Sequence, residues 1–177
     1  MSYRVVTCFN EKLLKSNGSK LLEDFASKWD TAIEFDCYYY DMDIKNYSLP
    51  KARNIHYYNL SNLSDYTDFV ERNKQHNGTE NGEFEYNETI DALTEAPKVF
   101  AISETMFNNS LSWVLWVDPH CYTMGKVTTN YLEKVFTHDN SEVPLTLIED
   151  QTHFAAFQIT YQPCVDLIVD LRGAYIT

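Results

Sequence analysis

The most constraining feature of this sequence is an apolar segment at residues 111–117, which reads Leu-Ser-Trp-Val-Leu-Trp-Val. A strand with one face in water alternates polar and apolar residues, whereas a strand that is covered on both faces is apolar almost throughout. The segment is also far shorter than the roughly 18 apolar residues that a membrane-spanning helix needs. We therefore predict that residues 111–117 form the central strand of a sheet with both faces covered.

Strand and helix patterns alternate along the rest of the chain. Runs rich in β-branched and aromatic residues predict strands at 3–9, 31–40, 54–58, 145–148 and 154–160. Apolar residues at helical spacing predict helices at 21–29, 63–70, 90–106, 128–136 and 164–175, with Pro97 starting or kinking the third. This alternation predicts an α/β fold with a mostly parallel central sheet flanked by helices.

The chain shows no internal repeat and no linker, so residues 1–177 are predicted to form a single domain. Residues 16–19, Ser-Asn-Gly-Ser, are typical of a turn. Residues 73–89 have no periodicity and are rich in Asn, Gly and Glu, which predicts a mobile surface loop. Loops of this kind often carry or cover a binding site.

Charge and composition exclude several classes of protein. The net charge is −12 and no stretch concentrates Lys or Arg, which argues against partners such as nucleic acid or an anionic membrane surface. The four cysteines are single, without a Cys-x-x-Cys pair, so neither a structural zinc site nor a disulfide framework is expected. The N-terminus lacks a signal-peptide pattern, and we expect a cytoplasmic protein.

Polar residues end three of the predicted strands, at residues 7–10, at 41–43 and at 118–120. In an open α/β sheet, ligands bind at the carboxyl ends of the strands. The last group is Asp118-Pro119-His120, in which two potential metal ligands lie two residues apart. A carboxylate with an imidazole suits Mn²⁺ better than Mg²⁺, which prefers oxygen ligands. Such a metal would bridge a diphosphate and stabilise it as a leaving group. The alternative is a plain turn, because Asp and Pro are common turn residues.

Four segments, taken in order and spacing, resemble a known family. They are Val5-Val6-Thr7-Cys8-Phe9-Asn10, the helix end at residues 25–29, Lys98-Val99-Phe100-Ala101-Ile102, and Trp113-Val114-Leu115-Trp116-Val117-Asp118-Pro119-His120. Together they resemble the GT-A-fold glycosyltransferases, particularly the short glycosyltransferase-like proteins of bacteria and their tailed viruses. The resemblance covers most of residues 3–136.

The resemblance implies a nucleotide-diphospho-sugar transferase-like fold and the metal-assisted transfer of a sugar from a nucleoside diphosphate to an unknown acceptor. Its residue-by-residue implications are that Thr7 and Phe9 line the nucleobase pocket, Asp41 approaches the base or ribose, Lys98 reaches the ribose or diphosphate, and Asp118 with His120 holds the metal. The acidic pair Glu149-Asp150 is a candidate general base. For each of these residues a plain structural role, as a strand end, a turn or a solvated side chain, remains open.

Two departures from the family pattern support a second interpretation. His120 stands where relatives normally have a second Asp, although some retaining glycosyltransferases use Asp-x-His with Mn²⁺. Family members also usually run on past this length with acceptor-site residues, which predicts a truncated version of the fold. The alternative interpretation is a catalytically inactive, truncated glycosyltransferase scaffold that acts as a binding or regulatory protein. Such a protein could be encoded by a phage.

Overall fold

The computed structural model describes residues 2–74, 92–107, 113–136, 145–147 and 154–158. Within these ranges the centre of the fold is a six-stranded sheet with the order β3-β2-β1-β4-β6-β5. The strands are β1 (Tyr3–Phe9), β2 (Glu34–Tyr39), β3 (Ile55–Asn59), β4 (Trp113–Val117), β5 (Leu145–Leu147) and β6 (Phe154–Gln158). The pairs β3–β2, β2–β1 and β1–β4 are parallel, and β6 is antiparallel to both of its neighbours. The predicted mostly parallel sheet is confirmed.

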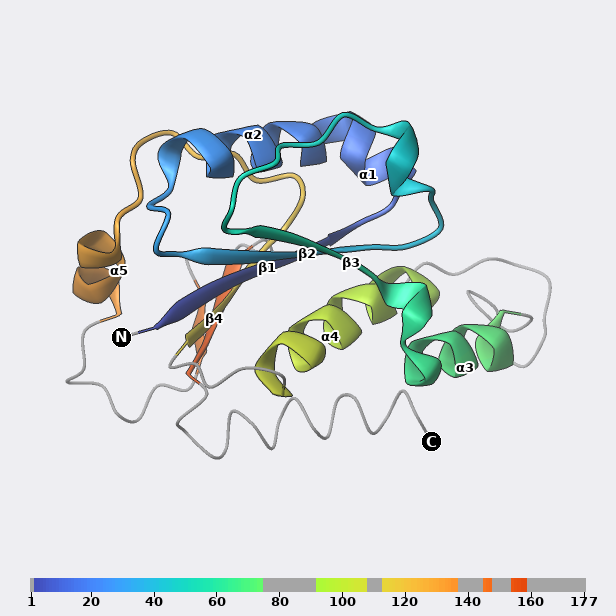
Figure 1. Ribbon diagram of the computed structural model, residues 1–177. Helices are drawn as coiled ribbons and strands as arrows, with labels where there is room; N and C mark the ends of the chain where they lie inside the picture. Colours follow the sequence, from blue (N-terminus) through green and yellow to red (C-terminus); the bar gives the residue numbers. More distant parts are fainter. Residues whose placement is uncertain (1, 75–91, 108–112, 137–144, 148–153, 159–177) are drawn as a thin grey trace.

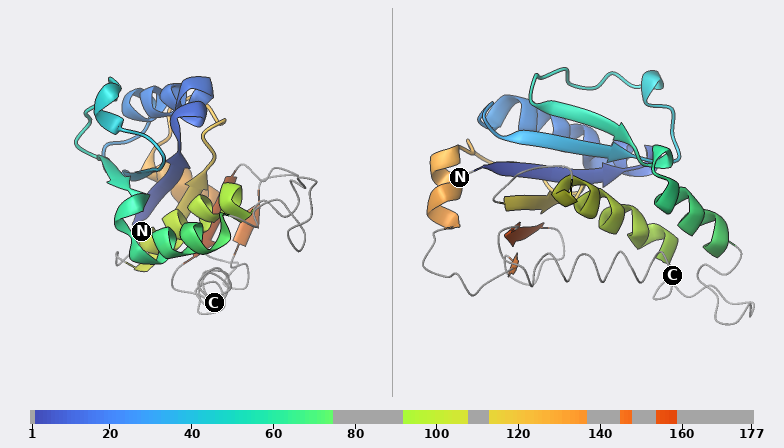
Figure 2. Two further views of the ribbon diagram at one scale, coloured as in Figure 1. Left: turned by 90° about the vertical axis from the view of Figure 1, so that its right-hand side faces the viewer. Right: turned by 60° about the horizontal axis from the view of Figure 1, so that its bottom comes forward.

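Helices cover both faces of this sheet (Figure 1). One face carries α1 (Glu11–Leu13), the π-helical turn η1 (Leu14–Gly18) and α2 (Ser19–Lys28), and the other carries α3 (Ser64–Asn73) and α4 (Ala92–Phe107). The short 3₁₀ turns η2 (Ile44–Asn46) and η3 (Leu60–Asn62) lie on either side of β3 in the sequence, and α5 (Thr129–Val135) follows β4. Figure 2 shows the same layers from two other directions. No helix among the described residues is long and apolar enough to cross a membrane.

The alternation of side chains along the strands divides the core into two parts. Even-numbered residues of β1 and β4, such as Val6 and Trp116, pack with α3 and α4. Odd-numbered residues, such as Val5 and Leu115, pack with α2. All five residues of β4 are buried, as predicted for a strand that is covered on both faces.

The predicted turn at residues 16–19 is wrong, because the backbone stays helical from α1 through η1 into α2. Asn10 caps the start of this helix, since its side chain accepts a hydrogen bond from the Leu13 N–H at 3.0 Å. The π-helical turn widens the helix at Gly18, where an added Cβ would lie 3.0 Å from the Leu13 carbonyl oxygen. Glycine therefore marks a tight contact inside a helix here, rather than a turn.

Pro97 lies inside α4 and does not start it. The predicted helix at 164–175 lies outside the described residues, as does the predicted mobile loop at 73–89 apart from its first two positions. Of these two, Asn73 belongs to the last turn of α3.

The direction in which the chain adds strands to the sheet reverses at one position, between β1 and β4. The chain proceeds outward from β1 to β2 and β3, and then returns through α4 to add β4 on the other side of β1. This reversal between β1 and β4 is a topological switch point, and ligands of open α/β sheets bind at the carboxyl ends of the strands there.

Candidate functional site

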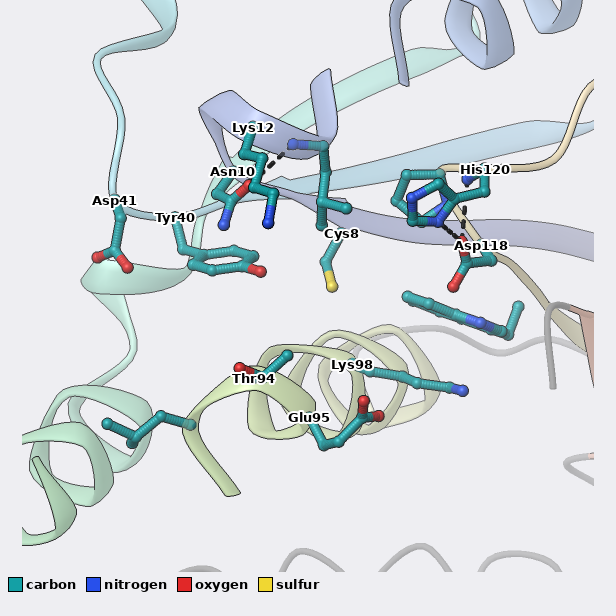
Figure 3. A pocket seen from close by; sticks show the side chains of 14 residues that line it. Cys8, Asn10, Lys12, Tyr40, Asp41, Thr94, Glu95, Lys98, Asp118 and His120 are labelled. Carbon is teal, nitrogen blue, oxygen red and sulfur yellow. Dashed lines mark hydrogen bonds and ion pairs between the residues drawn. The ribbon is translucent and has the colours of Figure 1, made fainter. Parts of the chain in front are cut away.

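A pocket of about 840 Å³ lies at the switch point, between the strand ends and the N-terminal half of α4 (Figure 3). Its lining combines the ends of three strands with residues of α1 and α4, namely Cys8, Asn10, Lys12, Leu13, Tyr40, Asp41, Leu93, Thr94, Glu95, Lys98, Trp116, Asp118, Pro119 and His120. The volume is in the range of small-molecule sites. The structure thus brings four of the predicted site residues, Asp41, Lys98, Asp118 and His120, into one pocket.

Asp118 and His120 form a close pair at one end of the pocket. Asp118 Oδ1 accepts a hydrogen bond from the His120 N–H at 2.9 Å and lies 2.7 Å from His120 Nδ1. The Asp118 carbonyl oxygen also accepts a hydrogen bond from the Cys121 N–H at 2.9 Å, which closes a turn. The sequence left two alternatives for residues 118–120, a plain turn or a pair of facing side chains. The structure contains both. The Asp118 side chain is 21% exposed and that of His120 is 50% exposed, so a ligand can reach both.

The Asp118 carboxylate and the His120 imidazole are the two potential ligands for a divalent cation at this end of the pocket. They are hydrogen-bonded to each other at 2.7 Å, so a cation bound by both would replace that bond. Within the described ranges no third His, Cys, Asp or Glu completes a cluster with them. A cation held by this pair would take its remaining ligands from phosphate and water, and the mixed oxygen and nitrogen donors suit Mn²⁺ better than Mg²⁺.

Lys98 projects from α4 toward the same end of the pocket as Asp118 (Figure 3). Its ammonium lies 5.2 Å from the centroid of the Trp116 ring, within the range of a cation–π interaction. Trp116 is only 2% exposed, so the ring is a fixed support for the lysine. A positive charge is thereby held near the end where a diphosphate is expected.

Asp41 lies at the opposite end of the pocket from Asp118 (Figure 3). It is the second residue after β2, is exposed, and has a φ of 51°, in the left-handed region. Asp adopts this conformation more readily than most residues because its short side chain can bond to nearby backbone. The backbone thus turns sharply at Asp41 as the chain leaves the sheet. The family resemblance implies that this residue approaches the base or ribose.

Thr7 and Phe9 do not line this pocket. Both are odd-numbered residues of β1 with no exposed surface, and Phe9 packs in the core on the α2 side of the sheet. Strand alternation turns them away from α4 and turns Cys8 toward it. Their neighbours Cys8 and Asn10 line the pocket in their place.

Two of the residues that the sequence did not single out give the pocket neutral polar walls. Burial raises the pKa of the Cys8 thiol, and the charge of Asp118 raises it further. Burial likewise raises the pKa of Tyr40. The raised pKa keeps both groups protonated at neutral pH, which argues against Cys8 as a thiolate nucleophile. The only sequence signal for them was their position at the ends of β1 and β2.

A buried carboxylate fixes the segment that follows the Asp118–His120 pair. Asp24 of α2 is 1% exposed, and its Oδ2 accepts a hydrogen bond from the Thr123 N–H at 3.0 Å. Trp29 Nε1 donates to Thr123 Oγ1 at 2.9 Å, and Lys28 Nζ donates to the Thr123 carbonyl oxygen. These contacts tie the segment after β4 to α2, so the candidate metal site is held from both sides. Glu149 and Asp150, the predicted general base, lie outside the described residues.

No protein-family model matches the chain, and no curated protein matches its sequence. A solved structure does match, that of the apo form of mouse xyloside xylosyltransferase 1. The match has a TM-score of 0.51 and 9% sequence identity, and it covers 99% of this chain and 74% of the mouse chain. At this identity the similarity concerns the fold alone. The chain thus has the glycosyltransferase-like α/β fold that its sequence predicts.

Proposed function

We propose that this protein binds a nucleoside-diphosphate sugar in the pocket at the switch point and transfers the sugar to an acceptor with the help of a divalent cation. The observation that carries the proposal is the convergence of Asp41, Lys98, Asp118 and His120, from three separate parts of the chain, on one pocket at the carboxyl ends of parallel strands. The similarity in fold to a xylosyltransferase supports the same class of ligand.

The two ends of the pocket suggest how such a ligand would lie. The diphosphate would lie at the end with Asp118, His120 and Lys98, where a cation and an ammonium can meet its oxygens. The nucleoside would extend toward Asp41, whose carboxylate can accept hydrogen bonds from ribose hydroxyls or base N–H groups. Asn10 and Tyr40, which lie on the walls, add neutral donors and acceptors along the way.

The charge of the pocket explains why a cation would be needed. Lys12 and Lys98 supply two positive charges, whereas Asp41, Glu95 and Asp118 supply three negative charges, so the lining carries one net negative charge with His120 neutral. An anionic diphosphate is disfavoured by this field. A divalent ion at Asp118 and His120 would make the site net positive and would stabilise the departing nucleoside diphosphate.

In this proposal each described residue has a limited task. Asp118 and His120 hold the ion, Lys98 neutralises phosphate charge, and Asp41 orients the nucleoside. An inverting transfer also needs a carboxylate that takes the proton from the acceptor hydroxyl, and Glu149 or Asp150 is the candidate from the sequence. The acceptor, a cytoplasmic location and the finer resemblance to short bacterial and phage proteins stay predictions.

A thermal-unfolding experiment tests donor binding. The protein is heated with a series of UDP- and GDP-sugars, including UDP-xylose, with and without Mn²⁺. A ligand at 100 times its dissociation constant stabilises the folded state by about 2.7 kcal/mol, which is roughly a 5–11 °C rise in Tm for a chain of this size. We expect this rise only when Mn²⁺ and the correct nucleotide sugar are both present.

The matched variants are Asp118→Asn, which removes the carboxylate charge at the pair, and Asp68→Asn, an exposed position on α3 away from the pocket. The Mn²⁺-dependent shift should disappear in the first variant and persist in the second. No metal-dependent shift with any nucleotide sugar would refute the proposal. A normal shift without release or transfer of the sugar would instead support the catalytically inactive scaffold.

A further inference from the structure

A second pocket, of about 510 Å³, lies on the α4 side of the sheet near its β3 edge. Its lining is polar and aromatic and consists of Arg4, Asp36, Tyr38, Tyr39, Tyr57, Tyr58, Asn59, Asn62, Leu63 and Glu104. It shares no lining residue with the pocket at the switch point. Neither the fold similarity nor the donor-site proposal assigns it a role.

The floor of this second pocket is a buried polar network. The Arg4 Nη1 group donates to Asp36 Oδ1 and to Oδ2, both at 3.1 Å, and the Asp36 side chain is 2% exposed. The Thr105 hydroxyl lies 3.4 Å from Asp36 Oδ2 and 3.3 Å from the Tyr38 hydroxyl. A buried ion pair is generally no more stabilising than well-packed apolar residues of the same volume. Fixed polar groups at the base of a pocket are, however, what specific hydrogen bonding to a ligand requires.

An aromatic side chain at the rim complements this floor. Tyr58 is 42% exposed, and its ring packs on that of buried Tyr38, with the centroids 5.3 Å apart. The ring is thereby held in place while much of its surface is open to solvent. Asn62, also exposed, adds an amide with both donors and an acceptor at the rim.

The lining disfavours two classes of ligand. Arg4 is opposed by Asp36 and Glu104, so the pocket carries one net negative charge, which disfavours phosphates, nucleotides and carboxylates. Leu63 is the single aliphatic residue in the lining, so a purely apolar ligand would find few partners. A neutral molecule that has both an apolar C–H face and several hydroxyl groups matches this lining. Its C–H face can pack on Tyr58, and its hydroxyl groups can bond to the amides, the carboxylates and the guanidinium.

We propose that this second pocket binds a neutral oligosaccharide. A sugar ring would stack on Tyr58, while its hydroxyl groups would bond to Asn62, Glu104 and Arg4. The site would hold a glycan at a distance from the donor pocket. The inference is independent of the proposed donor binding, because the two pockets have no residue in common.

Saturation-transfer NMR and titration calorimetry test this inference with defined probes. The neutral probes are cellotriose, xylotriose, maltotriose and chitotriose, and the anionic comparison is trigalacturonic acid. We expect at least one neutral trisaccharide to bind saturably and the anionic one to bind at least fivefold more weakly. Tyr58→Ala should weaken the neutral ligand at least fivefold, and Asn62→Ala, an exposed change that leaves the core intact, should weaken it at least twofold.

The control variants separate this site from the donor site and from general effects of aromatic residues. Tyr131→Ala removes a tyrosine on α5 that is 55% exposed and should leave binding unchanged. Asp118→Asn should also leave oligosaccharide binding unchanged, even though it is expected to abolish the Mn²⁺-dependent response to nucleotide sugars. The inference is overturned if no neutral trisaccharide binds, if trigalacturonic acid binds equally well, or if both pocket variants retain full affinity.

Discussion

Replacing the buried carboxylate of Asp24 tests whether α2 holds the segment that follows the candidate metal site. Asp24 Oδ1 lies 2.8 Å from Lys20 Nζ and 3.0 Å from Lys28 Nζ, and Oδ2 accepts from the Thr123 N–H at 3.0 Å. Losing hydrogen bonds to a charged group costs about 1.5–3 kcal/mol. Lys20 is 58% exposed and Lys28 is 31% exposed, so solvent screens both pairs and we take about 2 kcal/mol.

A loss of about 2 kcal/mol corresponds to a fall in Tm of roughly 4–8 °C for a chain of this size. Asp24→Asn is the test variant, and Glu23→Gln, the same kind of change at the exposed neighbour, is its control. Differential scanning calorimetry at pH 7 should show the fall in the first variant only. A change of less than 2 °C in Asp24→Asn would show that the network does not anchor this segment.

The same carboxylate predicts a pH dependence. Burial acts to raise the pKa of Asp24, but the hydrogen bonds from Lys20, Lys28 and the Thr123 N–H outweigh it and lower the pKa to about 2. A group with a lowered pKa stabilises the folded state above its unfolded pKa, near 4, and loses this contribution as the pH falls toward 2. The difference in Tm between the native protein and Asp24→Asn should therefore be full at pH 6 and should shrink between pH 4 and pH 2. A difference that stays constant over that range would contradict the assignment.

Three further substitutions test individual features of the fold and the site. Thr7→Val should raise Tm by roughly 2–4 °C and leave the response to nucleotide sugars unchanged. The Thr7 hydroxyl is buried and finds no hydrogen-bond partner among the described residues, which costs about 1 kcal/mol. Gly18→Ala should lower Tm, because a new Cβ 3.0 Å from the backbone oxygen of Leu13 costs more than the roughly 1 kcal/mol that Ala gains in helix propensity. Gly125→Ala, whose Cβ would meet no described atom within 4 Å, should be tolerated, and equal effects of the two changes in calorimetry would contradict this. Lys98→Met should weaken nucleotide-sugar binding about tenfold, because one hydrogen bond to a charged group contributes about 1.5 kcal/mol. The same change at the exposed Lys126 should leave the affinity unchanged. If titration calorimetry shows unchanged affinity in Lys98→Met, Lys98 does not belong to the site.

Local sequence patterns were sufficient to predict most of the secondary structure. The apolar run at 111–117 predicted the buried strand β4, because a strand that is covered on both faces has no polar side to show. Helical spacing predicted α2, α3, α4 and α5. The exception was residues 16–19, where residues that are common in turns instead continue a helix, because the cap at Asn10 and the packing of its apolar face outweigh local propensity.

The sequence also determined which residues stand at the strand ends, and therefore that Asp41, Asp118 and His120 would share one edge of a parallel sheet. It did not determine which side of the sheet holds the pocket. Alternation separates Thr7 and Phe9 from Cys8, but only the packing of α4 makes the even-numbered side the pocket side. Asp24 meets Thr123 across 99 residues, and Arg4 meets Asp36 across 32. Periodicity along the chain records which side chains share a face, whereas charged partners and pocket walls depend on which faces meet, and that is decided when the elements pack together.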